Sequence, residues 1–337
     1  APEDSIVNSA LLLMWLLRES VSPTTRRRRG RHFWPPRVGL TDTFAEFRAT
    51  STTSPPADER PLGIRVLCFG GFDVERNGLA VRDWRRNKAR NLLKILIDRR
   101  HPVPRDVMVE LLWPDVEARA AGNNLRVTLH ALRQALAGDS DLGSKSPDCV
   151  LLEGGNLILN PQVPLWIDVD EFTSRFLYGC KLEREGRDLE AIGAFEHAEE
   201  LYRDDYLIED LYEDWTQARR EELKDQYLLI VTKLADHCLE RRDFVGCILR
   251  CHKILQRDAC REDAYQRLMY AYALLGQPSQ ALHWYDVCER TLSRELDLGP
   301  SEYTIQLHQQ ILAREISRPA APDGSSRPAF PVRSGSR

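Results

Sequence analysis

The sequence predicts a mainly α-helical protein in which a small domain with a β-sheet and a hairpin precedes an all-α repeat domain. Strand-like alternation is confined to the first half of the 337 residues, whereas the second half has helical periodicity. The formal net charge of −4 also conceals a division, because residues 61–165 carry +3 and residues 166–316 carry −12. Opposite signs predict two domains with different partners, and only the first would attract a polyanion.

The composition is typical of a globular protein, with 42% hydrophobic and 29% charged residues. The apolar run at residues 10–17 is far shorter than the roughly 20 residues that cross a bilayer, so we expect no membrane span. No basic cluster precedes this run, which argues against a signal peptide. The eight cysteines form no regular framework, which favours a cytoplasmic protein. Residues 1–61, rich in Arg, Ser, Thr and Pro, and residues 317–337 are predicted to be disordered tails.

Strands are expected at both ends of the first domain, residues 62–162. Apolar and polar side chains alternate at residues 64–68, as in a half-buried strand. The pair Asn77-Gly78 follows, and it is a strong hairpin signal because both residues tolerate positive φ. A second hairpin is predicted at residues 150–159, around a Gly-Gly-Asn turn.

Three helices are expected between the two hairpins. Apolar spacing at residues 89–97 predicts the first helix, and Pro104 begins the second. The apolar positions of the second helix are Val107, Val109, Leu111 and Leu112. The third helix runs from about Glu117 to Leu136. The order of sheet, three helices and hairpin predicts a winged helix-turn-helix domain.

The third predicted helix has the side chains of a DNA-reading surface. At about 100° per residue, Leu125, Leu129, Leu132 and Leu136 share one stripe that must face the core. The remaining surface has no carboxylate and consists of Asn123, Asn124, Arg126, Val127, Thr128, His130, Arg133 and Gln134. A major groove requires this combination, because Arg pairs with guanine, Asn or Gln with adenine, and Val or Thr with the thymine methyl. The alternative is a solvated helix face, but such faces usually mix both signs of charge.

A basic cluster lies at the start of the first predicted helix. Its members are Trp84, Arg85, Arg86, Lys88 and Arg90. Contacts from these side chains to phosphates would position the protein on DNA without reading sequence. The alternative is that they only keep the surface soluble.

Residues 166–316 are predicted to be helical and to contain an internal repeat. The small and packing positions recur as Ala191, Phe195 and Ala198, as Cys247, Cys251 and Ile254, and as Ala281, Tyr285 and Cys288. The turn position recurs as Gly186, Arg242 and Gly276. A period of about 34 residues with small side chains where two helices approach is typical of tetratricopeptide repeats.

Two clusters in the helical half have a functional and a structural interpretation. The residues Cys238, Cys247, Cys251, His252 and Cys260 resemble a metal site, but they contain no C-x-x-C pair. We therefore expect buried thiols that act as small hydrophobes, with no metal and no cofactor. The acidic residues between 204 and 214 are expected to form a solvated face. Nucleotide-binding, serine-hydrolase and zinc-protease motifs are absent from the sequence, so we expect a protein that is not an enzyme.

Three segments resemble a known bacterial family. The segment VPRDVMVELLWPDVEARAAGNNLRVTLHALRQAL resembles the OmpR-type DNA-binding domain of SARP-type bacterial activators. The segments LWIDVDEF (residues 165–172) and LYEDWTQARREEL (residues 211–223) resemble the bacterial transcriptional activator domain that follows it. The resemblance covers about residues 62–316. It implies a transcription activator that binds double-stranded DNA as a homodimer on direct repeats near a promoter and recruits RNA polymerase.

The resemblance also implies roles for particular segments. In this family the third helix enters the major groove and the hairpin wing touches the neighbouring minor groove, which here falls on residues 155–158 and includes Asn156. In this family the loop after the second helix can contact polymerase, and here that loop consists of Trp113, Pro114, Asp115, Val116 and Glu117. OmpR-type wings often have an Arg near the tip, and this wing departs from that pattern with Asn156-Leu157-Ile158.

A second class of function remains open from the sequence. A tetratricopeptide scaffold would bind a protein partner and use its basic domain only structurally, with no DNA readout. The carboxylate-free surface of the third helix favours the DNA-binding activator, because a scaffold would not require it.

Overall fold

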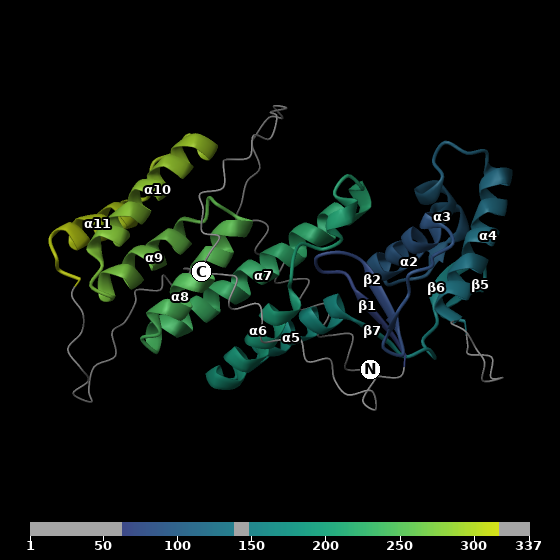
Figure 1. The fold of residues 1–337 in the computed structure, drawn as a ribbon, viewed down its shortest axis with the longest axis horizontal. Helices are drawn as coiled ribbons and strands as arrows, with labels where there is room; N and C mark the ends of the chain where they lie inside the picture. Colours follow the sequence, from purple (N-terminus) through teal and green to yellow (C-terminus); the bar gives the residue numbers. More distant parts are fainter. Residues whose placement is uncertain (1–62, 138–147, 317–337) are drawn as a thin grey trace. The chain divides into compact units, whose positions relative to one another are not determined.

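The computed structural model describes residues 63–137 and 148–316 (Figure 1). The fold is mainly α-helical, with small sheets in the N-terminal part of the described chain and helices throughout the C-terminal part, as the sequence predicts. The two predicted tails, residues 1–61 and 317–337, lie outside the described residues.

The first sheet begins with the predicted hairpin. Strand β1 (Ile64–Leu67) pairs antiparallel with β2 (Asp73–Arg76), which pairs antiparallel with β3 (Leu79–Ala80). The turn residues Asn77 and Gly78 have φ values of 48° and 75°. Both residues therefore adopt the left-handed conformation that the Asn-Gly pair predicts.

A distant segment completes this sheet. Strand β7 (Leu165–Ile167) pairs in parallel with β1, with Leu165 opposite Ile64, so that the strand order is β3-β2-β1-β7. This strand lies beyond residue 162, where the sequence places the end of the first domain. The chain that leaves the first sheet through β7 enters the helical half directly.

Helices α2 (Asn87–Arg99), α3 (Arg105–Leu112) and α4 (Ala118–Ala137) form at the three predicted positions. The inner face of α3 differs from the prediction, because Met108 and Leu112 are buried whereas Val107 is 42% exposed. The two buried residues are four positions apart and therefore share one face of the helix. Val107 lies about 100° around the helix from Met108, so it points away from that face.

The second sheet holds the wing against the start of α3. Strand β4 (Val103–Pro104) pairs with β6 (Asn156–Leu159), which forms the predicted second hairpin with β5 (Val150–Glu153). The backbone N–H of Arg105 also donates to the carbonyl of Gly155 in the hairpin turn at 3.0 Å. The wing is therefore tied to the helices that it flanks.

The C-terminal half consists of antiparallel helix pairs followed by a last helix. The pairs are α5 (Asp168–Arg184) with α6 (Asp188–Leu201), α7 (Asp214–Glu240) with α8 (Phe244–Arg257), and α9 (Glu262–Leu274) with α10 (Pro278–Leu296), and α11 (Glu302–Leu312) packs on the last pair. The turns inside the pairs contain Gly186, Arg242 and Gly276, with φ values of 73°, 61° and 74°. The same left-handed turn therefore recurs at the three predicted positions.

Cysteines fill packing positions between these helices. Cys247 and Cys251 are completely buried, with their Sγ atoms 3.9 Å apart. The contact with the thiol of Cys247, together with burial, raises the pKa of the Cys251 thiol. Within residues 63–137 and 148–316, His, Cys, Asp and Glu side chains form no group that could hold a metal ion. No helix of this described part is both long and apolar enough to cross a membrane.

Asp168 joins the two halves where β7 passes into α5. Its carboxylate is 1% exposed and accepts hydrogen bonds from the backbone N–H groups of Cys68 at 2.8 Å, Phe69 at 3.0 Å and Val169 at 2.8 Å. Burial raises the pKa of this carboxyl, and the three N–H donors oppose that rise. The loop after β1 is therefore bonded to the first turn of α5.

The connection between α6 and α7 packs on the same loop. The N–H of Leu207 donates to the carbonyl of Cys68 at 2.9 Å, and the ring of Phe69 lies 4.6 Å from that of Tyr202. We call residues 68–70 together with residues 202–210 the interdomain joint. One continuous hydrophobic core passes through it, from the first sheet to the helix pairs.

The acidic residues 204–210 of this connection are paired with basic side chains, whereas Glu213 and Asp214 are exposed, so the expectation of a solvated acidic face is confirmed only for the last two. Lys94 of α2 is 2% exposed and lies 2.5 Å from Asp210, and Arg90 lies 2.8 Å from Glu209. Asp204 bonds to Arg257 of α8. The basic partners belong to α2 and α8, which are distant from this connection in the sequence. Local charge patterning therefore does not reveal these ion pairs.

We predict that Asp168→Ala lowers the free energy of unfolding of the intact chain by about 3 kcal/mol, because it leaves buried N–H groups without an acceptor. Urea denaturation followed by circular dichroism measures this difference. Asp188→Ala, which removes an exposed carboxylate from the first turn of α6, is the matched control and should cost less than about 1 kcal/mol. Equal stability of the two variants would contradict the role assigned to Asp168.

Candidate nucleic-acid interface

Helix α4 separates a buried and an exposed surface as its periodicity predicts. Leu125, Leu129, Leu132 and Leu136 are all buried. Around the other side of the helix lie exposed side chains that we call the α4 face: Arg119, Asn123, Arg126, Val127, His130 and Gln134. The α4 face contains two arginines and three amide or imidazole groups, and helix α4 has no carboxylate.

Arg119 was not among the residues singled out from the sequence. It lies one helical turn before Asn123 and about two turns before Arg126, so a wheel extended to the first turn of the helix places it on the same face. The helical period of the α4 face is therefore the sequence signal that identifies Arg119.

Thr128 does not belong to this surface, which corrects the prediction. It is completely buried, and its hydroxyl has no hydrogen-bond partner within the described residues. Helix α4 packs against both α2 and α3, so its buried arc is wider than the leucine stripe and includes Thr128 and Ala131. Asn124, on the same flank, is half-buried.

Arg133 is occupied by a structural contact rather than free for DNA. Its Nε and Nη2 atoms donate to the carbonyl of Val150 at 3.1 and 2.9 Å, and Nε lies 3.2 Å from the carboxylate of Asp148. These bonds attach the start of β5 to α4. A helical wheel cannot reveal this contact, because the partner strand lies on another element.

The basic cluster at the start of α2 likewise contains both exposed side chains and side chains that are held by structural contacts. Arg85, Arg86 and Lys88 are exposed, as a phosphate-binding role requires. Trp84 is half-buried and packs on Phe72 with ring centroids 6.2 Å apart. Arg90 is held in the interdomain joint by Glu209, so it is not available to phosphates.

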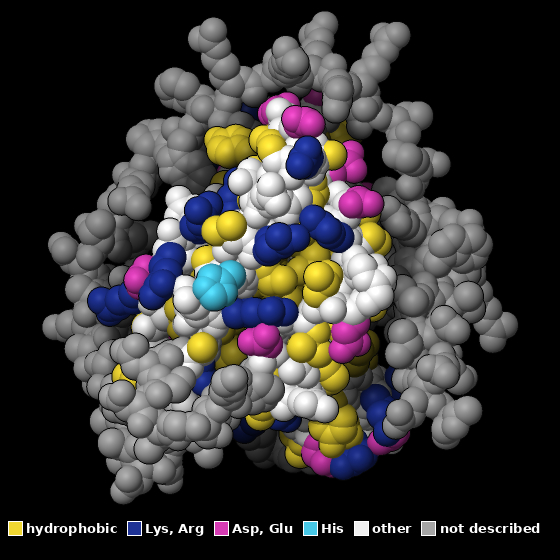
Figure 2. Space-filling model, turned by 90° about the vertical axis from the view of Figure 1, so that its right-hand side faces the viewer, with side chains coloured by type: hydrophobic (Ala, Val, Ile, Leu, Met, Phe, Trp, Pro, Cys, Tyr) yellow, Lys and Arg dark blue, Asp and Glu magenta, His cyan; other side chains and the backbone are white. Residues whose placement is uncertain are grey.

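Arg85 brings the two predicted groups together. Its Nη1 donates to Oε1 of Gln134 at 2.8 Å, which joins the loop before α2 to the α4 face. Arg85 itself has φ of 52°, and its backbone N–H donates to the carboxylate of Asp83 at 3.0 Å. Figure 2 shows Lys and Arg side chains around the histidine that is visible on this face of the molecule.

The wing contributes little positive charge. Asn156 is half-buried at the first position of β6, opposite Glu153 of β5. Gly154 and Gly155 form the turn, with φ values of 56° and 84°. The described wing therefore ends in glycines beside a carboxylate, which agrees with the missing arginine in its sequence.

The loop between α3 and α4 is exposed except at its first residue. Trp113 is half-buried and packs against the core. Pro114, Asp115, Val116 and Glu117 are exposed, and Val116 has 39% of its surface open. An apolar side chain between two carboxylates is thus presented next to the start of α4.

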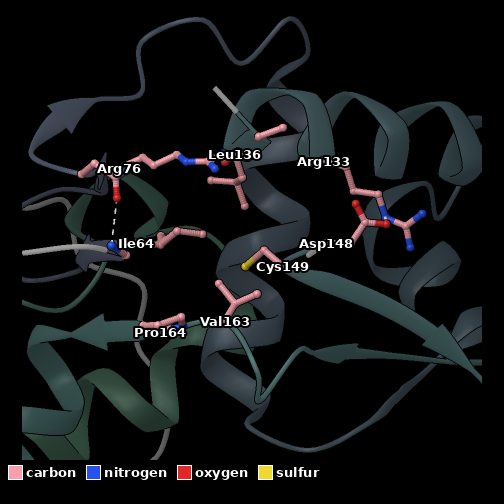
Figure 3. Close-up of a pocket in the computed structure, with 11 residues that line it drawn as sticks. Ile64, Arg76, Arg133, Leu136, Asp148, Cys149, Val163 and Pro164 are labelled. Carbon is pink, nitrogen blue, oxygen red and sulfur yellow. Dashed lines mark hydrogen bonds and ion pairs between the residues drawn. The ribbon is translucent and has the colours of Figure 1, made fainter. Parts of the chain in front are cut away.

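A small pocket of about 230 Å³ lies at the C-terminal end of α4 (Figure 3). Its walls are mainly apolar, and its charged pair Arg133 and Asp148 is mutually bonded. Burial raises the pKa of Cys149, which also lines the pocket, to about 11, so its thiol is protonated at neutral pH. Arg76, the third charged residue of the lining, donates to the carbonyl of Leu136, so none of the described lining residues offers a free charged group for chemistry.

Comparisons with known proteins agree with this architecture. Residues 167–312 match the model of the bacterial transcriptional activator domain. Over 225 residues the chain is 25% identical to the transcriptional regulatory protein MoaR1 of Mycobacterium tuberculosis, covering 66% of this chain and 70% of the relative. The structure of Mycobacterium tuberculosis EmbR in complex with a low-affinity phosphopeptide has a TM-score of 0.61 at 19% identity, covering 77% of this chain and 67% of that one, and it shares the fold.

A winged helix-turn-helix with an outward-facing α4, followed by a bacterial transcriptional activator domain, defines a transcription regulator. Its C-terminal half is a bacterial transcriptional activator domain, and the chain as a whole is similar to SARP-type bacterial transcriptional regulators. The family resemblance of the motifs in residues 165–172 and 211–223 is thereby confirmed.

We predict that Arg133→Ala lowers the free energy of unfolding by roughly 1–2 kcal/mol, because it breaks charged hydrogen bonds that are only partly solvated. Thermal denaturation measures the effect. Arg126→Ala, on the same helix but fully on the exposed side, should stay within about 0.5 kcal/mol of the wild type. Arg133 would not be structural if both variants melted together with the wild type.

Proposed function

We propose that the protein is a sequence-specific DNA-binding activator that binds direct repeats near promoters as a homodimer and recruits RNA polymerase. The observation that carries the proposal is the α4 face: a solvent-exposed helix surface with arginine, amide and imidazole groups and no carboxylate. A negative phosphate backbone repels carboxylates, and base edges offer the hydrogen-bonding groups that these side chains match.

Base readout is assigned to the middle of α4. Arg126 would donate to guanine acceptors, Asn123 and Gln134 would bond to base edges, and Val127, which is 45% exposed, would contact a thymine methyl. His130 lies between them on the same face. Arg119 extends this surface by one turn toward the helix N-terminus.

Phosphate contacts are assigned to Arg85, Arg86 and Lys88. They lie at the start of α2, and Arg85 reaches the C-terminal end of the α4 face. Charged side chains at the edge of a reading helix bind the backbone of the duplex and fix the register of the protein on it. Asn156 would be the corresponding contact from the wing.

Polymerase contact is assigned to the loop of residues 113–117. Its exposed Val116 is flanked by Asp115 and Glu117, which makes a small amphipathic surface beside α4 but outside the α4 face. An apolar anchor with a polar rim suits a protein partner better than a phosphate backbone. We place the end of the DNA-binding domain at β7 rather than at residue 162, because the sheet includes that strand.

Selection of bound duplexes from a random DNA library by the intact protein tests the proposal. A sequence-specific activator should enrich a motif that occurs as a direct repeat. A tetratricopeptide scaffold with a structural basic domain would enrich nothing, and that result would overturn the proposed function.

We predict that Arg126→Ala costs about 1–3 kcal/mol of specific binding and relaxes the preference at one base pair. Competition with single-base variants of the selected duplex measures both effects. Leu129→Ala is the contrasting control: it opens a cavity in the core costing on the order of 2–5 kcal/mol, so it lowers the melting temperature as well. Full base preference in Arg126→Ala would remove this residue from the readout.

We predict that Lys88→Ala weakens binding to all duplexes about equally and makes the dependence of log K on log salt shallower by about one unit. The reason is that one phosphate contact releases about 0.9 counterion. Fluorescence anisotropy over a salt series measures the slope. An unchanged slope would show that Lys88 does not touch the backbone of the duplex.

We predict that the double variant Val116→Ala/Glu117→Ala keeps its DNA affinity but loses about five- to tenfold in activation of a reporter, since interface anchors carry most of the binding energy. Wild-type activation by this variant would reject the loop as the polymerase contact. Reduced DNA affinity would instead assign these residues to the duplex.

A further inference from the structure

Gln134 has an unusual partner for a residue on a DNA-reading face. Nη1 of Arg85 lies 2.8 Å from its Oε1, although the two residues are 49 positions apart in the sequence and both are exposed. A guanidinium has only donors, so the amide must turn its oxygen toward Arg85. The Nε2 group of Gln134 then points away from that contact, with no hydrogen-bond partner among the described residues.

The local backbone aims Arg85 at this position. Arg85 adopts the left-handed conformation, which is uncommon for a residue with a side chain, and the carboxylate of Asp83 holds its N–H at 3.0 Å. Trp84 packs on Phe72 and anchors the same turn to the core. The direction of the Arg85 side chain is therefore set by the fold rather than by the contact alone.

We propose that Arg85 is a positioning residue that fixes the amide of Gln134, so that Gln134 presents hydrogen-bond donors to the DNA groove. The inference rests on the proposed DNA-binding function and specifies how one position is read. A glutamine with both groups free pairs with adenine, since it accepts from N6 and donates to N7. With Oε1 held by Arg85, the free Nε2 donors match guanine O6 and N7 or thymine O4.

The charge of Arg85 acts in the same direction. A guanidinium beside Oε1 places positive charge and further donors near the base edge, where an adenine amino group is itself a donor. Guanine and thymine present acceptors there and meet no such conflict. At the base pair under Gln134 we therefore expect a preference for guanine or thymine over adenine.

The test uses the intact protein and duplexes that carry each of the four bases at every position of the selected motif. Arg85→Ala should shift the preference toward adenine at one base pair by about five- to tenfold, because Oε1 becomes free to accept. In a Gln134→Ala background, Arg85→Ala should leave the base preference at that base pair unchanged. A double-mutant cycle gives this result when Arg85 acts through Gln134.

Arg86→Ala is the matched control, because Arg86 is the adjacent exposed arginine and bonds to no described side chain. It should weaken all duplexes alike and leave every base preference unchanged. If Arg85→Ala behaved in the same way, Arg85 would be a phosphate contact only and the inference would be overturned. Failure of the wild-type protein to enrich any duplex would instead overturn the proposed function, and the inference with it.

The side-chain amide of Gln134 gives a readout that needs no DNA. In nuclear magnetic resonance spectra of the free protein, Arg85→Ala should shift the Gln134 side-chain amide signals, whereas Arg86→Ala should not. Unchanged signals in Arg85→Ala would contradict the contact itself.

Discussion

The carboxylate of Asp168 is the interaction on which the arrangement of the described chain depends. A buried charge is costly unless hydrogen bonds surround it, and Asp168 receives them from the backbone of the loop after β1 and from its own helix. Because these donors belong to different halves of the chain, satisfying one carboxylate fixes both the end of the first sheet and the beginning of α5. The parallel pairing of β7 with β1 leads the chain to this point.

The interdomain joint attaches the two halves of the chain over a larger surface than Asp168 alone provides. The ring centroids of Phe69, Phe172 and Tyr202 lie within 5.6 Å of one another, and the ion pair of Lys94 with Asp210 ties α2 to the same connection. Breaking a buried ion pair by removing one partner costs about 3–5 kcal/mol, so the partners also specify which surfaces meet. The acidic excess of the helical half thus serves partly to dock it on the basic half.

The fold was largely predictable from the sequence, because its signals are local. The Asn77-Gly78 turn, the leucine stripe of α4 and the repeated left-handed turns each depend on residues close together in the chain. Local patterns failed where distant segments meet: Thr128 is enclosed by two helices and Arg133 is bonded to a strand. The bond from Arg85 to Gln134 is of the same kind, since two exposed polar residues give no sequence signal of their contact.

The shared core of the interdomain joint also limits how this protein can be recombined. A DNA-binding domain can be exchanged between regulators only if its hydrophobic surface is still covered in the new protein. Here the surface around Phe69 is covered by residues 202–210, which belong to the helical half. A functional chimera would therefore have to carry both pieces of the joint from the same parent, although they are more than 130 residues apart in the chain.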